Sequence, residues 1–219
     1  MNIMGIVERR EEEREQRRET IVRGALDLYV ERGVDRSALA DIAARVNLSR
    51  SLVYFYFGSK EGLLRSITAE GLRILLDGFS QAARRAESGL DGIHEIGRGY
   101  IAFAESHAGY YRAISAFQLM STQTAADDDD ESDRDLLAEI GRRAQAINRL
   151  LADQIERGQA DGSIRNSISD PMPTGLSLWF ATTGLIQMLS DSQRVEGHNY
   201  TAAELFESGL GILRAGLST

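Results

Sequence analysis

The chain has 219 residues, of which 42% are hydrophobic and 26% are charged, and it contains two prolines and no cysteine. This composition is that of an ordinary globular protein rich in helix formers, with room for one large domain or for a small domain joined to a medium one. The absence of cysteine excludes disulfides, thiolate zinc sites and cysteine nucleophiles, and the formal net charge of −8 argues against nucleic-acid binding by the whole surface.

The first predicted element is a helix over residues 12–32. Ile21, Leu28 and Tyr29 recur on one of its faces, and Gly33 follows as a C-terminal stop. The residues before it are too charged for a signal peptide or a membrane anchor. We therefore expect a cytoplasmic protein without a membrane segment.

Two short helices are predicted next, over residues 37–46 and 49–55. Ser37 and Ser49 stand where each helix would receive its N-cap, and Asn47 stands where the first must end in a left-handed residue. A bracing helix followed by two short helices and a tight turn is the helix-turn-helix layout, in which the second short helix enters the major groove of DNA.

A hydrophobic staple between Leu48 and Val53 assigns the faces of the second short helix. It turns both side chains inward together with Phe57. The side chains left to face outward are Arg50, Ser51, Leu52 and Tyr54. Arginine reads guanine edges, leucine meets thymine methyl groups and tyrosine binds phosphate, so these residues suit DNA. The alternative is that Leu52 and Tyr54 belong to the core of a small bundle.

A long helix over residues 59–86, with Ser59 as its N-cap, exceeds what a small DNA-binding head needs, and we expect it to connect two domains. Further helices are predicted over residues 91–107, 110–120, 133–160, 174–190 and 202–217. The predicted fold class is therefore all-α. Residues 36–60 carry four basic side chains against one acidic, so one basic end is expected on an acidic protein.

The acidic run TQTAADDDDESD at residues 122–133 is predicted to be a solvated loop, since consecutive aspartates repel one another. A calcium site is the alternative, but the run lacks the alternating ligands and central glycine of an EF-hand. His94, His107 and His198 fall in no metal or triad spacing, and no glycine-rich phosphate loop occurs. We expect no enzymatic activity, no metal and no cofactor.

The stretch SALADIAARVNLSRSLVYFYFGSKEGLL, residues 37–64, resembles the DNA-binding signature of the TetR family of transcriptional regulators. The matching residues are Ile42, Ala43, Ser49, Tyr54, Tyr56, Phe57, Ser59, Lys60, Glu61 and Leu64. The resemblance implies a helix-turn-helix domain over residues 12–64 and a helical ligand-binding and dimerisation domain over residues 65–219. It also implies phosphate contacts from Ser37, Tyr54, Tyr56 and Lys60, and Lys60 suits this role independently because a helix N-terminus attracts phosphate.

The family resemblance further implies a repressor that a small apolar or amphipathic inducer releases from a palindromic operator in double-stranded DNA. Candidate ligand-binding residues are Tyr100, Phe103, His107, Tyr111, Phe117, Met120, Trp179 and Phe180, and their alternative role is ordinary core. The last two helices carry small residues that permit close packing, and they are expected to form a homodimer. The competing function is a helical protein-interaction module that binds no DNA.

Overall fold

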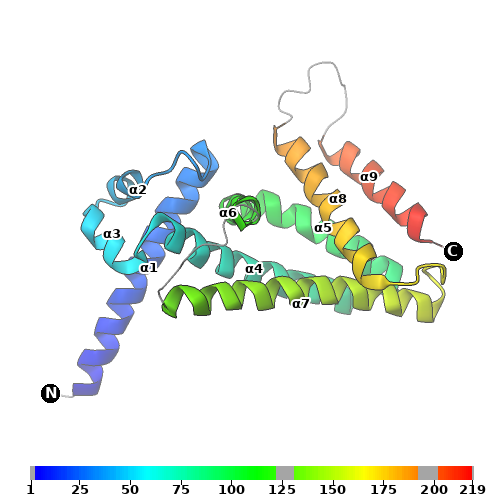
Figure 1. Ribbon diagram of the computed structural model, residues 1–219, viewed down its shortest axis with the longest axis horizontal. Coiled ribbons are helices and arrows are strands. Elements are labelled where there is room, and N and C mark those ends of the chain that lie inside the picture. The colour runs from blue at the N-terminus through cyan, green and yellow to red at the C-terminus, as the bar shows by residue number, and fades with distance from the viewer. Residues whose placement is uncertain (1–2, 122–130, 192–201, 219) are drawn as a thin grey trace. The chain divides into compact units, whose positions relative to one another are not determined.

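The computed structural model describes residues 3–121, 131–191 and 202–218 (Figure 1). The helices are α1 (Ile3–Arg32), α2 (Leu39–Arg45), α3 (Arg50–Phe57), α4 (Lys60–Arg85), α5 (Gly89–Ser106), α6 (Ala108–Ser121), α7 (Glu131–Asp161), α8 (Pro171–Asp191) and α9 (Ala202–Leu217). Within the described ranges the only β-pairing is an isolated antiparallel bridge between Ile164 and Ser218. The all-α prediction is confirmed. Most of the predicted acidic loop lies outside the described residues.

The described chain forms two compact units. The first contains residues 1–72 and 107–140, and the second contains residues 73–106 and 141–219. Helix α6 thus belongs with α1 to α3, while α4 contributes to both units as one continuous helix. The functional boundary between residues 64 and 65 stays a prediction.

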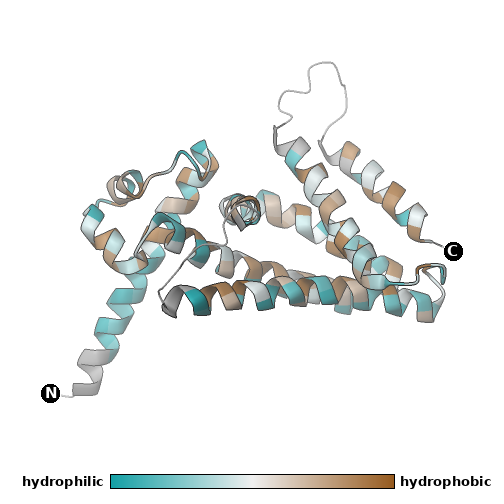
Figure 2. Cartoon of the chain, viewed as in Figure 1, coloured by the Kyte–Doolittle hydropathy of each residue, from teal (hydrophilic) through white to brown (hydrophobic). Residues whose placement is uncertain are grey.

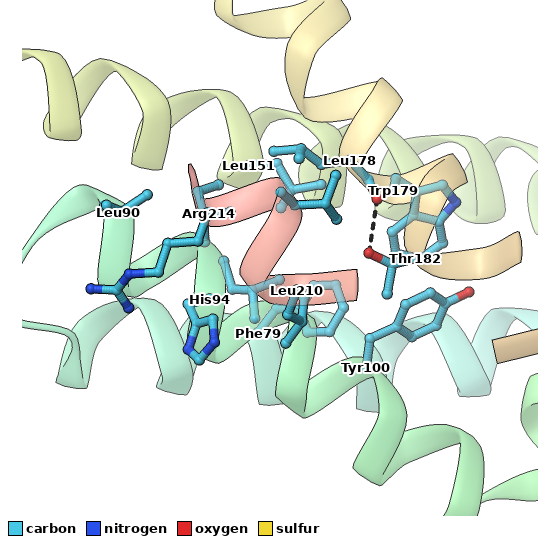
Figure 3. Close-up of a pocket in the computed structure, with 14 residues that line it drawn as sticks. Phe79, Leu90, His94, Tyr100, Leu151, Leu178, Trp179, Thr182, Leu210 and Arg214 are labelled. Atoms are coloured by element: carbon cyan, nitrogen blue, oxygen red, sulfur yellow. Dashed lines mark hydrogen bonds between the residues drawn. The ribbon is translucent and has the colours of Figure 1, made fainter. Parts of the chain in front are cut away.

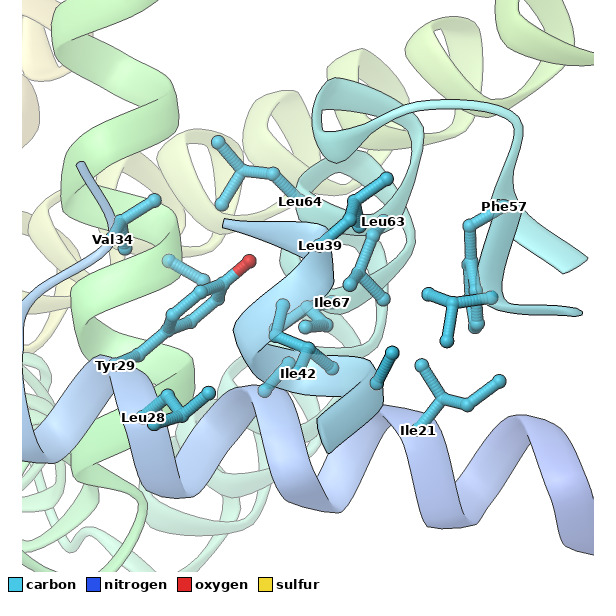
Figure 4. Packing of buried hydrophobic residues seen from close by; sticks show 14 residues of the cluster. Ile21, Leu28, Tyr29, Val34, Leu39, Ile42, Phe57, Leu63, Leu64 and Ile67 are labelled. Carbon is cyan, nitrogen blue, oxygen red and sulfur yellow. The ribbon is translucent and has the colours of Figure 1, made fainter. Parts of the chain in front are cut away.

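The first unit is built around one hydrophobic cluster, which Figure 4 shows in close-up. Ile21, Leu28 and Tyr29 of α1 are buried in it as the periodicity predicts. Ile42 of α2 and Ile67 of α4 pack in the same cluster and are fully buried. Helix α6 joins through Ala113 and through Arg112, whose guanidinium donates to the carbonyl of Tyr29 at 3.2 Å. This packing fixes the position of α2 and α3 against α1.

Helix α1 begins nine residues earlier than predicted, at Ile3 rather than residue 12. The added turns contain glutamate and arginine, which are good helix formers and pair along the helix surface, as Arg9 and Glu13 do at 3.9 Å. Gly33 follows the helix with a φ of +86°, which confirms the predicted C-terminal stop.

Tyr29 places a phenol in this core without a hydrogen-bond partner for its hydroxyl among the described residues. Burial, together with the nearby charge of Glu61, raises its pKa above the ordinary value near 10. The folded protein therefore holds this proton at alkaline pH, where the unfolded chain releases it, so stability falls as the pH rises through the unfolded value.

Tyr29→Phe removes the orphaned hydroxyl and should raise the free energy of unfolding by about 1 kcal/mol at neutral pH. The variant should also lose less stability than the wild type between about pH 9 and pH 11, where an unfolded tyrosine ionises. Urea unfolding at several pH values measures both effects. A less stable variant would mean that the hydroxyl has a favourable partner.

Candidate functional site

The turn between α2 and α3 has the geometry predicted for it. Asn47 adopts a left-handed φ of +54°, which lets the chain reverse after α2. The Ser49 hydroxyl then accepts a hydrogen bond from the Leu52 amide at 3.2 Å and caps α3. Leu48 packs against the cluster, and Val53 is fully buried in it, as the staple requires. The second short helix is thus held with one face against the core.

Ser37 does not occupy the predicted position. The N-cap of α2 is Ala38, and the Asp41 carboxylate supports it by accepting from the Ala38 amide at 3.1 Å. The Ser37 side chain is fully buried, and its hydroxyl donates to the carbonyl of Gly33 at 2.7 Å. The cap prediction is wrong, and a phosphate contact from this hydroxyl is not available in this conformation.

The outward face of α3 carries one large side chain that the sequence reasoning missed. Phe55 is 76% exposed and Tyr54 is 55% exposed. Phe55 lies two residues from both Val53 and Phe57, so at 100° per residue it points away from these buried positions. The same rotation, applied to the predicted inward positions of Val53 and Phe57, would have predicted that Phe55 faces outward.

The other predicted side chains of α3 differ in exposure. Arg50 and Ser51 are exposed. Leu52 is half-buried and lies outside the hydrophobic cluster that holds Val53. Tyr56 is also half-buried and packs against the cluster, so less of its side chain is available to a ligand.

Not all the positive charge of residues 36–60 is available to bind an anion. The Arg45 guanidinium forms two hydrogen bonds to the Glu31 carboxylate, at 2.7 and 2.6 Å, and these bonds lower the pKa of Glu31. This pairing neutralises a cation of the basic stretch. Lys60 opens α4, which Ser59 caps through the Gly62 amide at 2.9 Å. Its ammonium donates to the carbonyl of Asp35 at 2.9 Å, which is an uncharged acceptor.

The second unit contains a cavity with an empty volume of about 480 Å³, which includes the part open to solvent (Figure 3). One side is aromatic: Tyr100 of α5 and Trp179 of α8 stack with their ring centres 4.5 Å apart, and the Phe79 ring meets both edge-on. Towards the other side in Figure 3 lie His94 and the guanidinium of Arg214. The cavity lining is thus mostly apolar, with the Arg214 charge and the His94 imidazole on one side and the Thr182 and Tyr100 hydroxyls on the aromatic side, a lining that suits a small amphipathic molecule.

Two of the eight predicted ligand-binding residues, Tyr100 and Trp179, line this cavity. Phe103 is buried elsewhere in the second unit, and Phe180 is 65% exposed. The remaining four belong to the first unit: His107, Tyr111, Phe117 and Met120. The other six do not line this cavity, because residue type does not reveal which face of a helix borders an internal space.

The described part of the chain comprises residues 3–121, 131–191 and 202–218. No helix there is long and apolar enough to cross a membrane. No three histidine or carboxylate side chains there come together as metal ligands.

Comparison with known proteins gives matches to both units. Residues 21–67 match the family model for bacterial regulatory proteins of the tetR family, and residues 93–213 match the tetracyclin repressor-like C-terminal domain. The nucleoid occlusion factor SlmA of Haemophilus influenzae is 28% identical over 93 residues, which span 42% of this chain and 43% of that protein.

Solved structures resemble nearly the whole chain. The ketosteroid transcriptional regulator KstR2 of Mycobacterium tuberculosis has a TM-score of 0.68 at 18% identity, with 93% of this chain and 95% of that one covered. A tetR-family regulatory protein from Rhodococcus RHA1 has a TM-score of 0.65 at 20% identity, with 90% and 96% covered. These likenesses show the fold, and the two family models together cover most of the sequence. The chain therefore belongs to the TetR family and is a DNA-binding transcriptional regulator.

Proposed function

We propose that this regulator is a repressor that binds a palindromic operator as a homodimer and leaves it when a small apolar or amphipathic molecule occupies the cavity. The observation that carries the proposal is the continuity of helix α4 between the DNA-binding unit and the cavity. The same continuous helix opens beside the recognition helix with Lys60 and lines the cavity with Phe79. A ligand that displaces Phe79 therefore has a rigid element through which to act on the DNA-binding unit.

The proposed DNA contacts are the exposed or half-exposed side chains around α3. Arg50, Ser51, Leu52 and Phe55 would meet base edges, while Tyr54, Tyr56 and Lys60 would meet phosphate. Phe55 enters this set because of its exposure, and Ser37 leaves it because of its burial. One short helix reads few base pairs, which favours two copies on a two-fold symmetric site.

Exposed apolar side chains on α8 and α9 support the proposed dimer. Phe180 is 65% exposed, Ile212 is 70% exposed and Leu205 is 37% exposed. Leu205 and Ile212 are two turns apart on the same face of α9. A face of this kind can pack against its own copy around a two-fold axis.

The proposal requires that binding of the ligand weakens binding of DNA, and that binding of DNA weakens binding of the ligand. By linkage, a molecule that weakens DNA binding by some factor must itself bind the DNA complex more weakly by that factor. Trp179 lines the cavity, so its fluorescence is a direct probe of occupancy.

The test begins by selecting, with the purified protein, fragments from the genome that encodes it. We expect enrichment of a palindromic sequence, bound with an affinity that falls steeply with salt. Compounds that release this fragment should change Trp179 fluorescence and bind the free dimer more tightly than the complex. A protein that enriches no sequence is not a sequence-specific repressor, and a releasing compound with equal affinity for both forms would disprove the ligand mechanism.

Phe55→Ala should leave the thermal unfolding midpoint almost unchanged, because the side chain makes little contact with the core. Its affinity for the selected operator should fall by about 1.5 to 3 kcal/mol, the value of burying a phenylalanine against DNA. Calorimetry and operator titration separate the two quantities. A large fall in the midpoint without a loss of affinity would remove Phe55 from the interface.

Leu52→Ala should cost less stability than the roughly 2 to 5 kcal/mol of a fully buried leucine, since the side chain is half-buried. If Leu52 covers a thymine methyl group, replacing that thymine with uracil should weaken the wild type and add little to the loss in the variant. Equal sensitivity of both proteins to the missing methyl would exclude the contact.

A further inference from the structure

The N-terminal turns of α1 separate positive from negative charge. Figure 2 shows the coloured part of these turns as strongly hydrophilic. The arginine face is formed by Arg10, Arg14 and Arg17, all exposed, with Arg18 at its end. The glutamate face is formed by Glu8, Glu12, Glu15 and Glu19, which are also exposed.

The separation follows from helical geometry. At 100° per residue, Arg10, Arg14 and Arg17 fall within about 60° of one another, and the glutamate face spans a similar sector roughly opposite. Glu11, Glu13 and Arg9 lie at the borders. The pairs they form, such as Arg14 with Glu11 at 3.7 Å, are exposed and therefore weak. The arginines thus remain available to another anion.

The arginine face lies on the side of α1 that carries the recognition helix. By the same rotation, it continues the line of Ile21 and Leu28, which are buried in the core of the first unit. Arg18 makes the connection to α3 directly: its guanidinium donates to the carbonyl of Tyr56 at 3.2 Å and lies 4.8 Å from the centre of the Phe57 ring. In Figure 1 the blue N-terminal half of α1 continues past α3.

The spacing and charge fit a phosphate backbone. Arg10 and Arg17 are seven positions apart in the helix, a rise of about 11 Å. One strand of duplex DNA presents a phosphate roughly every 3.4 Å along the axis, so the row has room for about three contacts. Such contacts would offset two features that weaken DNA binding: the net charge of −8, which repels phosphate, and the neutralisation of Arg45 by Glu31.

We propose that the arginine face binds phosphate groups of duplex DNA next to the base pairs that α3 reads, while the glutamate face points away from the DNA. Only one orientation of the helix on DNA is then favourable, because a helix rotated by half a turn would bring a row of carboxylates to the DNA phosphates. The proposal rests on the proposed binding of DNA by α3 and adds a second, sequence-independent contact surface to it.

The test compares three variants on the selected operator and on a duplex of unrelated sequence and equal length. Arg10→Ala/Arg14→Ala/Arg17→Ala should weaken binding to both duplexes by similar factors. The slope of log affinity against log salt should become shallower by about 2 to 3, since each phosphate contributes about 0.9. Alanine is the best helix former, so circular dichroism should show the helix retained.

Arg10→Lys/Arg14→Lys/Arg17→Lys keeps the charge and should keep most of the slope. The matched control Arg84→Ala/Arg85→Ala/Arg165→Ala removes the same three charges from exposed positions in the second unit and should leave the slope unchanged. If the alanine variant has the wild-type salt slope, or if the control changes the slope equally, the arginine face does not bind phosphate. That outcome would leave the proposed function standing. A wild type that binds neither duplex would overturn the proposed function together with it.

Discussion

A protein that carries Phe180→Asp and Ile212→Asp is expected to be a monomer and to lose specific operator binding. Among the side chains of α8 and α9 whose placement the structure describes, these two are the most exposed large apolar groups. Burial of each would contribute about 1.5 to 3 kcal/mol, and two-fold symmetry counts each contact twice. The substituted carboxylates would instead be buried opposite one another, which is strongly unfavourable. Light scattering should show half the wild-type mass.

Loss of the second recognition helix should lower operator affinity by roughly a thousandfold or more, towards that of nonspecific binding. The control is Val30→Asp with Leu119→Asp, which adds the same charge at exposed apolar positions of the first unit and should leave the mass unchanged. If the α8 and α9 variant stays dimeric, the dimer interface lies on another surface. If it is monomeric and keeps full affinity, a palindromic operator is not needed.

Local sequence signals predicted the recognition helix well because local interactions hold it. The φ of Asn47, the cap by Ser49 and the burial of Val53 each depend on residues within one or two turns. Ser37 failed as a cap because a competing local solution exists. Asp41 supplies the hydrogen bond to the start of α2, and the Ser37 hydroxyl returns to Gly33.

The cavity was harder to predict because helices far apart in the sequence build it. Trp179 and Phe180 are adjacent and similar in type, yet Trp179 lines the cavity and Phe180 faces outward. Only the packing of α5, α8 and α9 decides between them. Arg214, near the C-terminus, reaches the same cavity as His94 of α5, and no spacing in the sequence connects the two.

Close helix packing also limits which substitutions the second unit tolerates. Among the glycines that the structure describes in this unit, Gly89 is the one where an added methyl group would come nearest to other atoms. The amide of Gly89 donates to the Asp161 carboxylate at 2.8 Å, and the next amide, that of Leu90, donates to the Ser163 hydroxyl at 3.2 Å. A side chain at Gly89 would overlap the backbone of Gly158 and of Gln154 on α7. Backbone cannot move aside as a side-chain end can.

Gly89→Ala is therefore expected to destabilise the protein by about 3 kcal/mol, the upper end of the usual cost of overpacking. The separation of α5 from α7 should also break the hydrogen bond between Gly89 and Asp161. Gly99→Ala is the matched control in the same helix, since a methyl group there meets nothing within 4 Å. It should instead stabilise the protein by about 0.5 to 1 kcal/mol, because alanine loses less chain entropy in a helix than glycine. Denaturant unfolding measures both.

The same pair of variants tests whether the packing of α5 matters to the proposed ligand response. Leu90 and Tyr100 of α5 and Leu151 of α7 line the cavity, so a shift of α5 at Gly89 changes its walls. Gly89→Ala should weaken the Trp179 fluorescence response to any releasing compound, whereas Gly99→Ala should preserve it. Operator binding in the absence of ligand should survive in Gly89→Ala at temperatures where the protein stays folded, because α1 to α3 belong to the other compact unit. Full ligand response in a Gly89→Ala protein of wild-type stability would mean that α5 and α7 separate without cost and that the glycine is not required for their close approach.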